Sequence, residues 1–163
     1  MGLSVDELTT ELIATFPGLV KGAGYGETVL FYNPSQLLPA GVYFASFKEQ
    51  DGPNDRASRL DREGVFRLAF GLPEHTYGEL FGPRPPRPVR GGVVDGQHDF
   101  AAVSRLTPHP VYAWIGWVQV LSPNLETWAR ISPLLAEAHQ RASEGYEKRI
   151  RPAHRAKGHS RHG

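Results

Sequence analysis

The stretch 106-LTPHPVYAWIGWVQVLSPNLETWARISPLLAEA-138 decides the fold class, because it joins an extended segment to a helical one. The hexapeptide GWVQVL, Gly116 to Leu121, has the pattern of a β-strand. Pro123 stops that strand, and Asn124 is a typical helix N-cap residue. Beyond it, apolar side chains recur at three- and four-residue spacing, which predicts a helix with one buried face. These side chains are Trp128, Ile131, Leu135, Ala138 and Ala142.

The part of the chain before residue 83 alternates between helical and extended patterns. Ser4 and Glu7 form the capping box S-x-x-E, which predicts an N-terminal helix. The stretch LVKGAGYGETVLFYNP holds two apolar runs around a glycine-rich turn, which is typical of a β-hairpin. GVYFASF (41–47) and VFRLAF (65–70) predict two further strands, and PEHTYGELFG (73–82) predicts a short helix.

These elements predict an α+β fold with a mainly antiparallel sheet of about four or five strands. We expect the N- and C-terminal helices to pack on one face of that sheet. Pro133 lies inside the terminal helix, where it predicts either a kink or the start of a second helix capped by Ser132. Residues 1–147 are expected to form a single α+β domain, within the usual range of roughly 100–200 residues.

The charge distribution separates residues 148–163 from the rest of the chain. They carry six basic residues and no acidic one, whereas residues 1–147 carry 12 basic and 17 acidic residues. Because the segment has almost no apolar side chains, we predict a disordered basic tail. Such a tail offers one alternative function, nucleic-acid binding. The acidic body has no basic stripe, so nucleic acid is not the favoured partner.

The composition predicts a soluble, cytoplasmic protein with no membrane association. The chain contains no cysteine, which excludes disulfides, thiolate zinc sites and cysteine nucleophiles. Its N-terminus lacks the basic region and long apolar core of a signal peptide. Apolar runs such as TVLFY are far shorter than the ~20 residues that span a bilayer.

A proline- and arginine-rich segment, GPRPPRPVRGGVVDGQHD, follows the predicted short helix. Proline removes backbone donors, so this segment is expected to be a loop rather than part of a sheet. Two interpretations remain for its residues 83–92. It is a solvated, extended excursion, or it is a flap whose Arg84, Arg87 and Arg90 face an anion.

Several motifs resemble a known protein family. Four stretches carry this resemblance: FPG…GETVLFYNP, DREGVFRLAFG, HDF and RLTPHPVYAWIGWVQVLSPNLETWARISPLLAEAH. They resemble an actinobacterial family, domain of unknown function six-one-nine-four. The resemblance covers roughly Phe16 to Ala142, and PHPVYA…GWV is its most specific part. The layout is also loosely similar to the MmcQ/YjbR-like proteins, a small α+β fold for which DNA binding has been suggested. Neither resemblance implies a reaction, a cofactor or catalytic residues.

The chain lacks the common catalytic and cofactor motifs, so we predict no cofactor and no metal. It has no G-x-S-x-G elbow, no phosphate loop, no dinucleotide fingerprint and no H-E-x-x-H. GAGYGE (22–27) lacks the lysine of a phosphate loop and is better interpreted as a hairpin turn. His75 is a further candidate histidine.

The candidate site therefore rests on residues around one proline-flanked histidine. His109 lies between Pro108 and Pro110, which hold its side chain in one direction. The candidate ligand-binding residues are His109, His98, Asp99, Tyr112 and Trp114. We expect a binding or accessory protein with a shallow pocket for a small molecule near His109. The alternative is an enzyme that uses His109 as general acid or base, oriented by a carboxylate such as Asp99.

Overall fold

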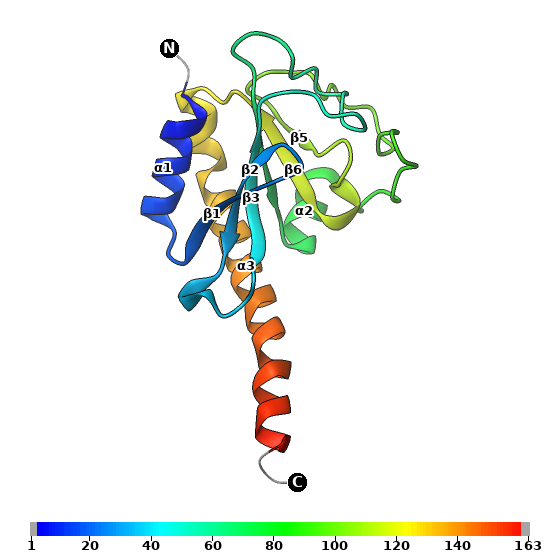
Figure 1. Ribbon diagram of the computed structural model, residues 1–163. Helices are drawn as coiled ribbons and strands as arrows, with labels where there is room; N and C mark the ends of the chain where they lie inside the picture. The colour runs from blue at the N-terminus through cyan, green and yellow to red at the C-terminus, as the bar shows by residue number, and fades with distance from the viewer. Residues whose placement is uncertain (1–2, 161–163) are drawn as a thin grey trace.

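The computed structural model describes residues 3–160, with side chains described up to Arg151. It contains one antiparallel sheet with the strand order β1-β2-β3-β4-β6-β5 (Figure 1). The strands are β1 Leu19–Gly24, β2 Glu27–Tyr32, β3 Val42–Lys48, β4 Arg67–Gly71, β5 Leu106–Pro108 and β6 Trp117–Leu121. The predicted α+β class is confirmed, and so are the hairpin, here β1 and β2, and the strand 41–47, here β3.

The sheet has six strands, so the expected four or five were too few. The additional strand is β5, which has only three residues and pairs with β6 at the edge of the sheet. Pro108 ends it opposite Val118. Proline is tolerated at such an edge because no neighbouring strand needs its missing amide. A segment this short, with proline in it, has no alternating pattern from which a strand can be predicted.

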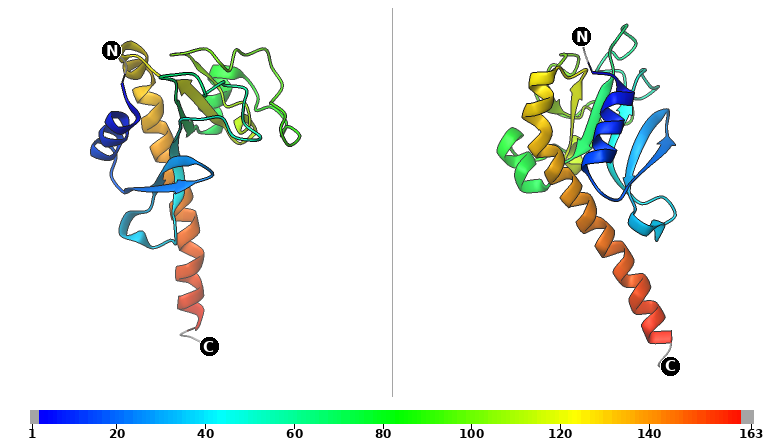
Figure 2. Two further views of the ribbon diagram at one scale, coloured as in Figure 1. Left: turned by 45° about the horizontal axis from the view of Figure 1, so that its top comes forward. Right: turned by 90° about the vertical axis from the view of Figure 1, so that its left-hand side faces the viewer.

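Two long helices lie side by side on one face of the sheet (Figures 1 and 2). α1 Val5–Thr15 begins with the predicted capping box of Ser4 and Glu7. α3 Leu125–Ser160 begins where the Asn124 side chain accepts a hydrogen bond from the Thr127 amide. It continues through Pro133 as one helix, so no second helix starts there. Among the described helices, none is long and apolar enough to cross a membrane.

The core lies between this helix pair and the sheet. Leu8 and Leu12 of α1 and the predicted α3 stripe from Ile131 onward are buried, whereas Trp128 is half-buried. From the sheet, alternate side chains of the central strands face the helices. They include Leu30, Phe47, Leu68, Phe70, Val118 and Val120. This alternation leaves Arg67, Ser46 and Gln119 on the opposite face.

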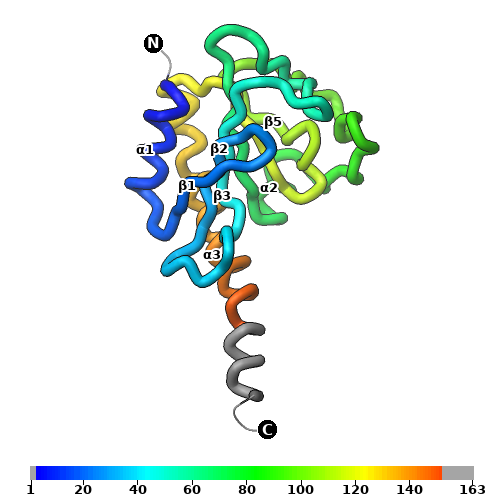
Figure 3. Tube along the Cα trace, viewed as in Figure 1, coloured from blue at the N-terminus to red at the C-terminus, as the bar shows by residue number. Residues whose placement is uncertain are grey.

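That opposite face is covered by long connecting segments rather than by helices. Ser58, in the segment between β3 and β4, donates a hydrogen bond to Gln119. Gln119 in turn donates to the carbonyl oxygen of Phe100, which lies between α2 Glu74–Phe81 and β5. The trace in Figure 3 shows the segment between α2 and β5 on the side of the sheet away from α1. The polar side chains of this face are therefore buried.

The predicted boundary at residue 148 lies inside α3. Arg149, just beyond it, donates a hydrogen bond to the Gly41 carbonyl oxygen at 3.3 Å. Residues 161–163 lie outside the described part of the chain, as do the side chains from residue 152 onward. The disordered tail over residues 148–163 stays a prediction, which a truncation tests directly.

Candidate functional site

A cavity of about 580 Å³ is lined by His109, by residues of the sheet face that carries Ser46, and by one side of α3. It lies where β1, β2 and β3 meet the η2 turn (Ala113–Ile115), the start of β6 and the middle of α3. Four aromatic side chains line it: Tyr25, Tyr43, Tyr112 and Trp117. The rings of Tyr43 and Trp117 meet edge to face with centroids 6.4 Å apart. These rings form apolar walls, as in most small-molecule sites.

His109 lines this cavity and is fixed by the turn that follows it. Its backbone N–H donates to the Trp117 carbonyl oxygen at 3.0 Å, which extends the pairing of β5 with β6. Its Nδ1 accepts hydrogen bonds from the amides of Val111 and Tyr112, at 3.0 and 3.1 Å. An imidazole nitrogen that accepts carries no proton, so Nε2 carries it and is the donor of the ring.

The electrostatic surroundings keep this imidazole neutral. Burial lowers the pKa of His109 well below its ordinary value, and the positive charge of Arg67 lowers it further. The nearby Asp55 acts in the opposite direction but does not outweigh them. The side chain is 2% exposed. At neutral pH the ring is therefore a fixed, uncharged hydrogen-bond donor.

A buried charge cluster lies beside His109. Arg67 of β4 is completely buried, and its guanidinium binds both carboxylate oxygens of Asp55, with Nη1 2.9 Å from Oδ1. Glu27 Oε1 lies 3.8 Å from Arg67 Nη2, and Lys48 Nζ lies 3.9 Å from Asp55 Oδ2. The buried Nε of Arg67 has no hydrogen-bond partner among the described residues. A buried cation is tolerated because the two carboxylates compensate its charge.

The two carboxyl groups of this cluster differ in protonation behaviour. Burial raises the pKa of Asp55, but the hydrogen bonds and charge of Arg67 outweigh burial, so its pKa is lowered overall. For Glu27 burial dominates, and its pKa is raised despite Arg67 and Lys48. Glu27 also accepts a hydrogen bond from the Ser46 hydroxyl at 3.2 Å. Asp55 is thus the ionised partner of Arg67, while Glu27 lines the cavity.

One face of α3 forms the remaining wall. Five residues of α3 line the cavity at three- and four-residue spacing, so they share one side of the helix. They are Arg141, Glu144, Gly145, Lys148 and Arg149. Arg141 Nη2 donates to the Ile115 carbonyl oxygen at 3.1 Å. Within residues 3–151, whose side chains are described, the three basic residues of this wall form no ion pair.

Comparison with known proteins places the chain in a family. The profile of the family of unknown function DUF6194 matches residues 3–151. The chain belongs to this family. No curated protein and no solved structure matches it. DUF6194 membership assigns no activity, so the function must be argued from the cavity itself. The actinobacterial origin and the looser similarity to MmcQ/YjbR-like proteins stay predictions.

The structure of this DUF6194 chain brings two of the five candidate residues together in the cavity, His109 and Tyr112. Their ring centroids lie 5.0 Å apart. The other three lie elsewhere. His98 packs against Phe81 and Phe100. Asp99 accepts a hydrogen bond from the Ala101 amide, and Trp114 lies beneath the Arg87 guanidinium at 4.7 Å.

The structure also places two arginines of the predicted loop and His75. Arg87 covers Trp114, and Arg84 Nη2 lies 4.0 Å from a Glu74 carboxylate oxygen. His75 is exposed, 4.0 Å from Glu137. Among the residues that the structure describes, no three His, Asp or Glu side chains converge as metal ligands would.

Sequence reasoning missed Arg67, Glu27 and the α3 wall. A signal for Arg67 was available, because a single arginine stands inside the apolar run VFRLAF. Charged residues at such positions are rarely fully buried unless they are paired. The α3 wall was missed because Lys148 and Arg149 were assigned to a tail. The helical spacing of Lys148 and Arg149 from Arg141 is recognised only when α3 is known to continue past residue 147.

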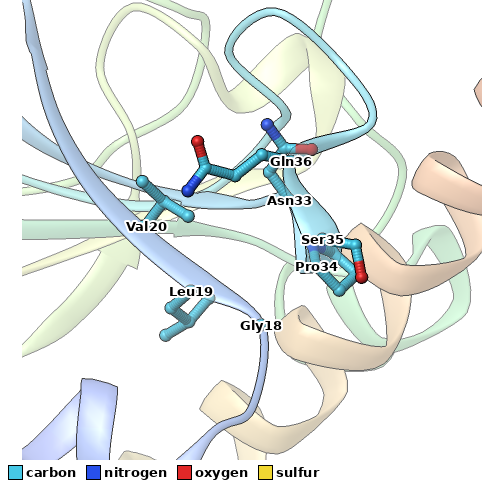
Figure 4. A pocket seen from close by; sticks show the side chains of 7 residues that line it. All are labelled: Gly18, Leu19, Val20, Asn33, Pro34, Ser35 and Gln36. Carbon is cyan, nitrogen blue, oxygen red and sulfur yellow. The ribbon is translucent and has the colours of Figure 1, made fainter.

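A second hollow, of about 350 Å³, lies between β1 and the turn after β2 (Figure 4). It is lined by Gly18, Leu19, Val20, Asn33, Pro34, Ser35 and Gln36. None of these side chains is titratable. The Asn33 amide is already hydrogen-bonded to the backbone of Leu38 in both directions. This hollow therefore offers little chemistry.

Proposed function

We propose that the protein is a binding or accessory protein whose cavity beside His109 holds a small organic molecule. The observation that carries the proposal is the composition of that cavity: about 580 Å³, with aromatic walls and a few fixed polar groups. Small-molecule sites combine these features, because apolar walls supply affinity and polar groups supply orientation. We infer a cytoplasmic location as well, since a chain without cysteine needs no oxidising compartment.

The polar groups of the cavity are held in place before any ligand arrives. Both amides that follow His109 hold its Nδ1, so the Nε2–H group has one orientation. The Ser46 hydroxyl is oriented by Glu27. Rigid donors and acceptors reduce the ordering cost of binding, which favours recognition of a specific acceptor on the ligand.

Binding is tested by NMR with a library of small aromatic compounds and the full-length protein. We expect chemical-shift changes to concentrate on cavity residues, including the indole N–H of Trp117. Gly145→Leu, which places a side chain into the cavity, is expected to abolish them. Gly78→Leu is the matched control, because Gly78 is an exposed glycine in α2 with open space around it. No binding, or binding that Gly145→Leu leaves intact in a folded protein, contradicts the proposal.

A second candidate function is an acid–base enzyme that uses the same cavity. Glu27, whose pKa is raised by burial, and the neutral His109 both line it. Two titratable groups whose environments shift their pKa values in opposite directions are typical of acid–base sites. Here Glu27 takes the place of Asp99 as the carboxylate, with His109 as a fixed donor. Glu27→Gln distinguishes the candidates, because it removes turnover of an enzyme while a binding protein keeps its ligand.

A further inference from the structure

We infer that the ligand of this cavity is an anion: a small molecule with a flat apolar body whose carboxylate, phosphate or similar group lies against α3. The inference rests on the proposed binding function and specifies its ligand class. It combines two features that occupy different walls of the same cavity. One is the set of basic side chains on α3, and the other is the aromatic lining contributed by the sheet.

The α3 wall carries more positive than negative charge. Three of its members are basic and one, Glu144, is acidic. Glu144 accepts a long hydrogen bond from Gln140, at 3.5 Å, rather than pairing with any of the three cations. Arg149 and Arg141 each donate to one backbone carbonyl oxygen. A guanidinium has five N–H groups, so both retain donors for a carboxylate or phosphate.

Arg141 is the least exposed of the three basic residues on this wall, because it is half-buried whereas Lys148 and Arg149 are exposed. Burial lowers the pKa of Arg141, and the positive charge of Arg84 lowers it further. The cation is therefore under-compensated by the protein's own groups, and a bound anion would relieve this. The buried Nε of Arg84 also lacks a hydrogen-bond partner among the described residues. Arg84 lies 4.0 Å from a Glu74 carboxylate oxygen, whereas Arg141 has no carboxylate partner among the described side chains.

Gly71, the last residue of β4, allows Arg141 to reach the aromatic wall. A Cβ at this position would overlap the Arg141 guanidinium and lie 2.8 Å from Trp117 Nε1. The Arg141 guanidinium and the indole edge of Trp117 therefore lie together over Gly71, which has no side chain. A ligand whose ring contacts Tyr43 and Trp117 therefore has its anionic substituent within reach of Arg141. A purely inorganic anion would leave the aromatic walls unused.

Two fluorescent probes with the same ring system test the inference. 8-Anilinonaphthalene-1-sulfonate is an anion, and N-phenyl-1-naphthylamine has the same apolar body without the sulfonate. We expect the sulfonate to bind the full-length protein at least about fivefold more tightly, an advantage that salt reduces. Arg141→Gln is expected to weaken sulfonate binding about tenfold, as for a lost charge-assisted hydrogen bond, and to change amine binding less than twofold.

Lys148→Gln is a second, milder variant in case Arg141→Gln perturbs folding. Lys148 is exposed, so we expect a loss of about twofold to fivefold for the sulfonate alone. Arg130→Gln is the matched control, since Arg130 is an exposed α3 arginine outside the cavity. If both probes bind equally and neither variant separates them, the anion inference is overturned while the binding function stands. If neither probe binds at all, the anion inference and the proposed binding function are both contradicted.

Discussion

Replacing Asp55 by alanine tests the buried charge cluster beside His109. The change removes both oxygens that hold the Arg67 guanidinium and leaves Glu27, at 3.8 Å, as the remaining carboxylate near Arg67. Because the Arg67 side chain is 1% exposed, water cannot replace the lost partner without rearrangement. Breaking a buried ion pair typically costs 3–5 kcal/mol. With Glu27 still present, we expect a loss of about 3 kcal/mol.

The assay is urea denaturation at pH 7, with the midpoint and slope followed by tryptophan fluorescence. The double variant Asp55→Ala, Arg67→Met removes the buried cation together with its partner. We expect it to recover most of the loss, because an apolar replacement of a buried pair is often neutral. A loss of unfolding free energy below about 1 kcal/mol for Asp55→Ala would show that Asp55 and Arg67 do not form a desolvated ion pair. It would mean that the cluster is hydrated and behaves as a surface pair.

The other predictions concern His109, the cavity glycine and the C-terminal segment. Because the pKa of His109 is lowered in the folded state, acid protonates this histidine in the unfolded chain before it does so in the folded protein. The free energy of unfolding therefore falls as pH drops below about 6.5. His109→Asn, which keeps an acceptor for the two amides, should flatten urea-midpoint profiles between pH 5 and 7, whereas His75→Asn should not. Gly145→Ala should raise stability by up to about 1 kcal/mol in a thermal melt, because its Cβ would meet Val42 at an ordinary 3.6 Å. Truncation after Glu147 should leave the melting temperature within a few degrees of the full chain, and a larger drop would show that the predicted tail belongs to the domain.

The elements with strong local patterns could be predicted from the sequence. The capping box at Ser4, the apolar run of β3 and the α3 stripe are each set by neighbouring residues, so a short window contains the whole signal. β5 has no such window, because three residues beside two prolines carry no periodicity. Arg67 shares a strand face with Ala69, as the two-residue repeat of a strand requires. Its burial depends on distant loops that cover that face, which no local pattern reveals.

The site was predictable only where it is local. His109 and Tyr112 are three residues apart in one turn, so their proximity follows from the sequence. Glu27 reaches the same cavity from the start of β2, and Arg149 reaches Gly41 across 108 residues of chain. Such contacts depend on the strand order and on the length of α3. His98 and Asp99 were selected as neighbours of His109 in the sequence, but the segment that holds them turns toward Phe81 and Phe100.

A crystal structure of the full-length protein soaked with 8-anilinonaphthalene-1-sulfonate would show whether the cavity beside His109 binds an aromatic anion. We expect density for the ring system in the cavity between Tyr43 and Trp117, with the sulfonate within about 4 Å of Arg141, the range of an ion pair. The Nε2–H group of His109 should face the bound molecule. Density at the Gly18–Gln36 hollow or on the outer surface, with an empty cavity beside His109, would show that this cavity is not the binding site.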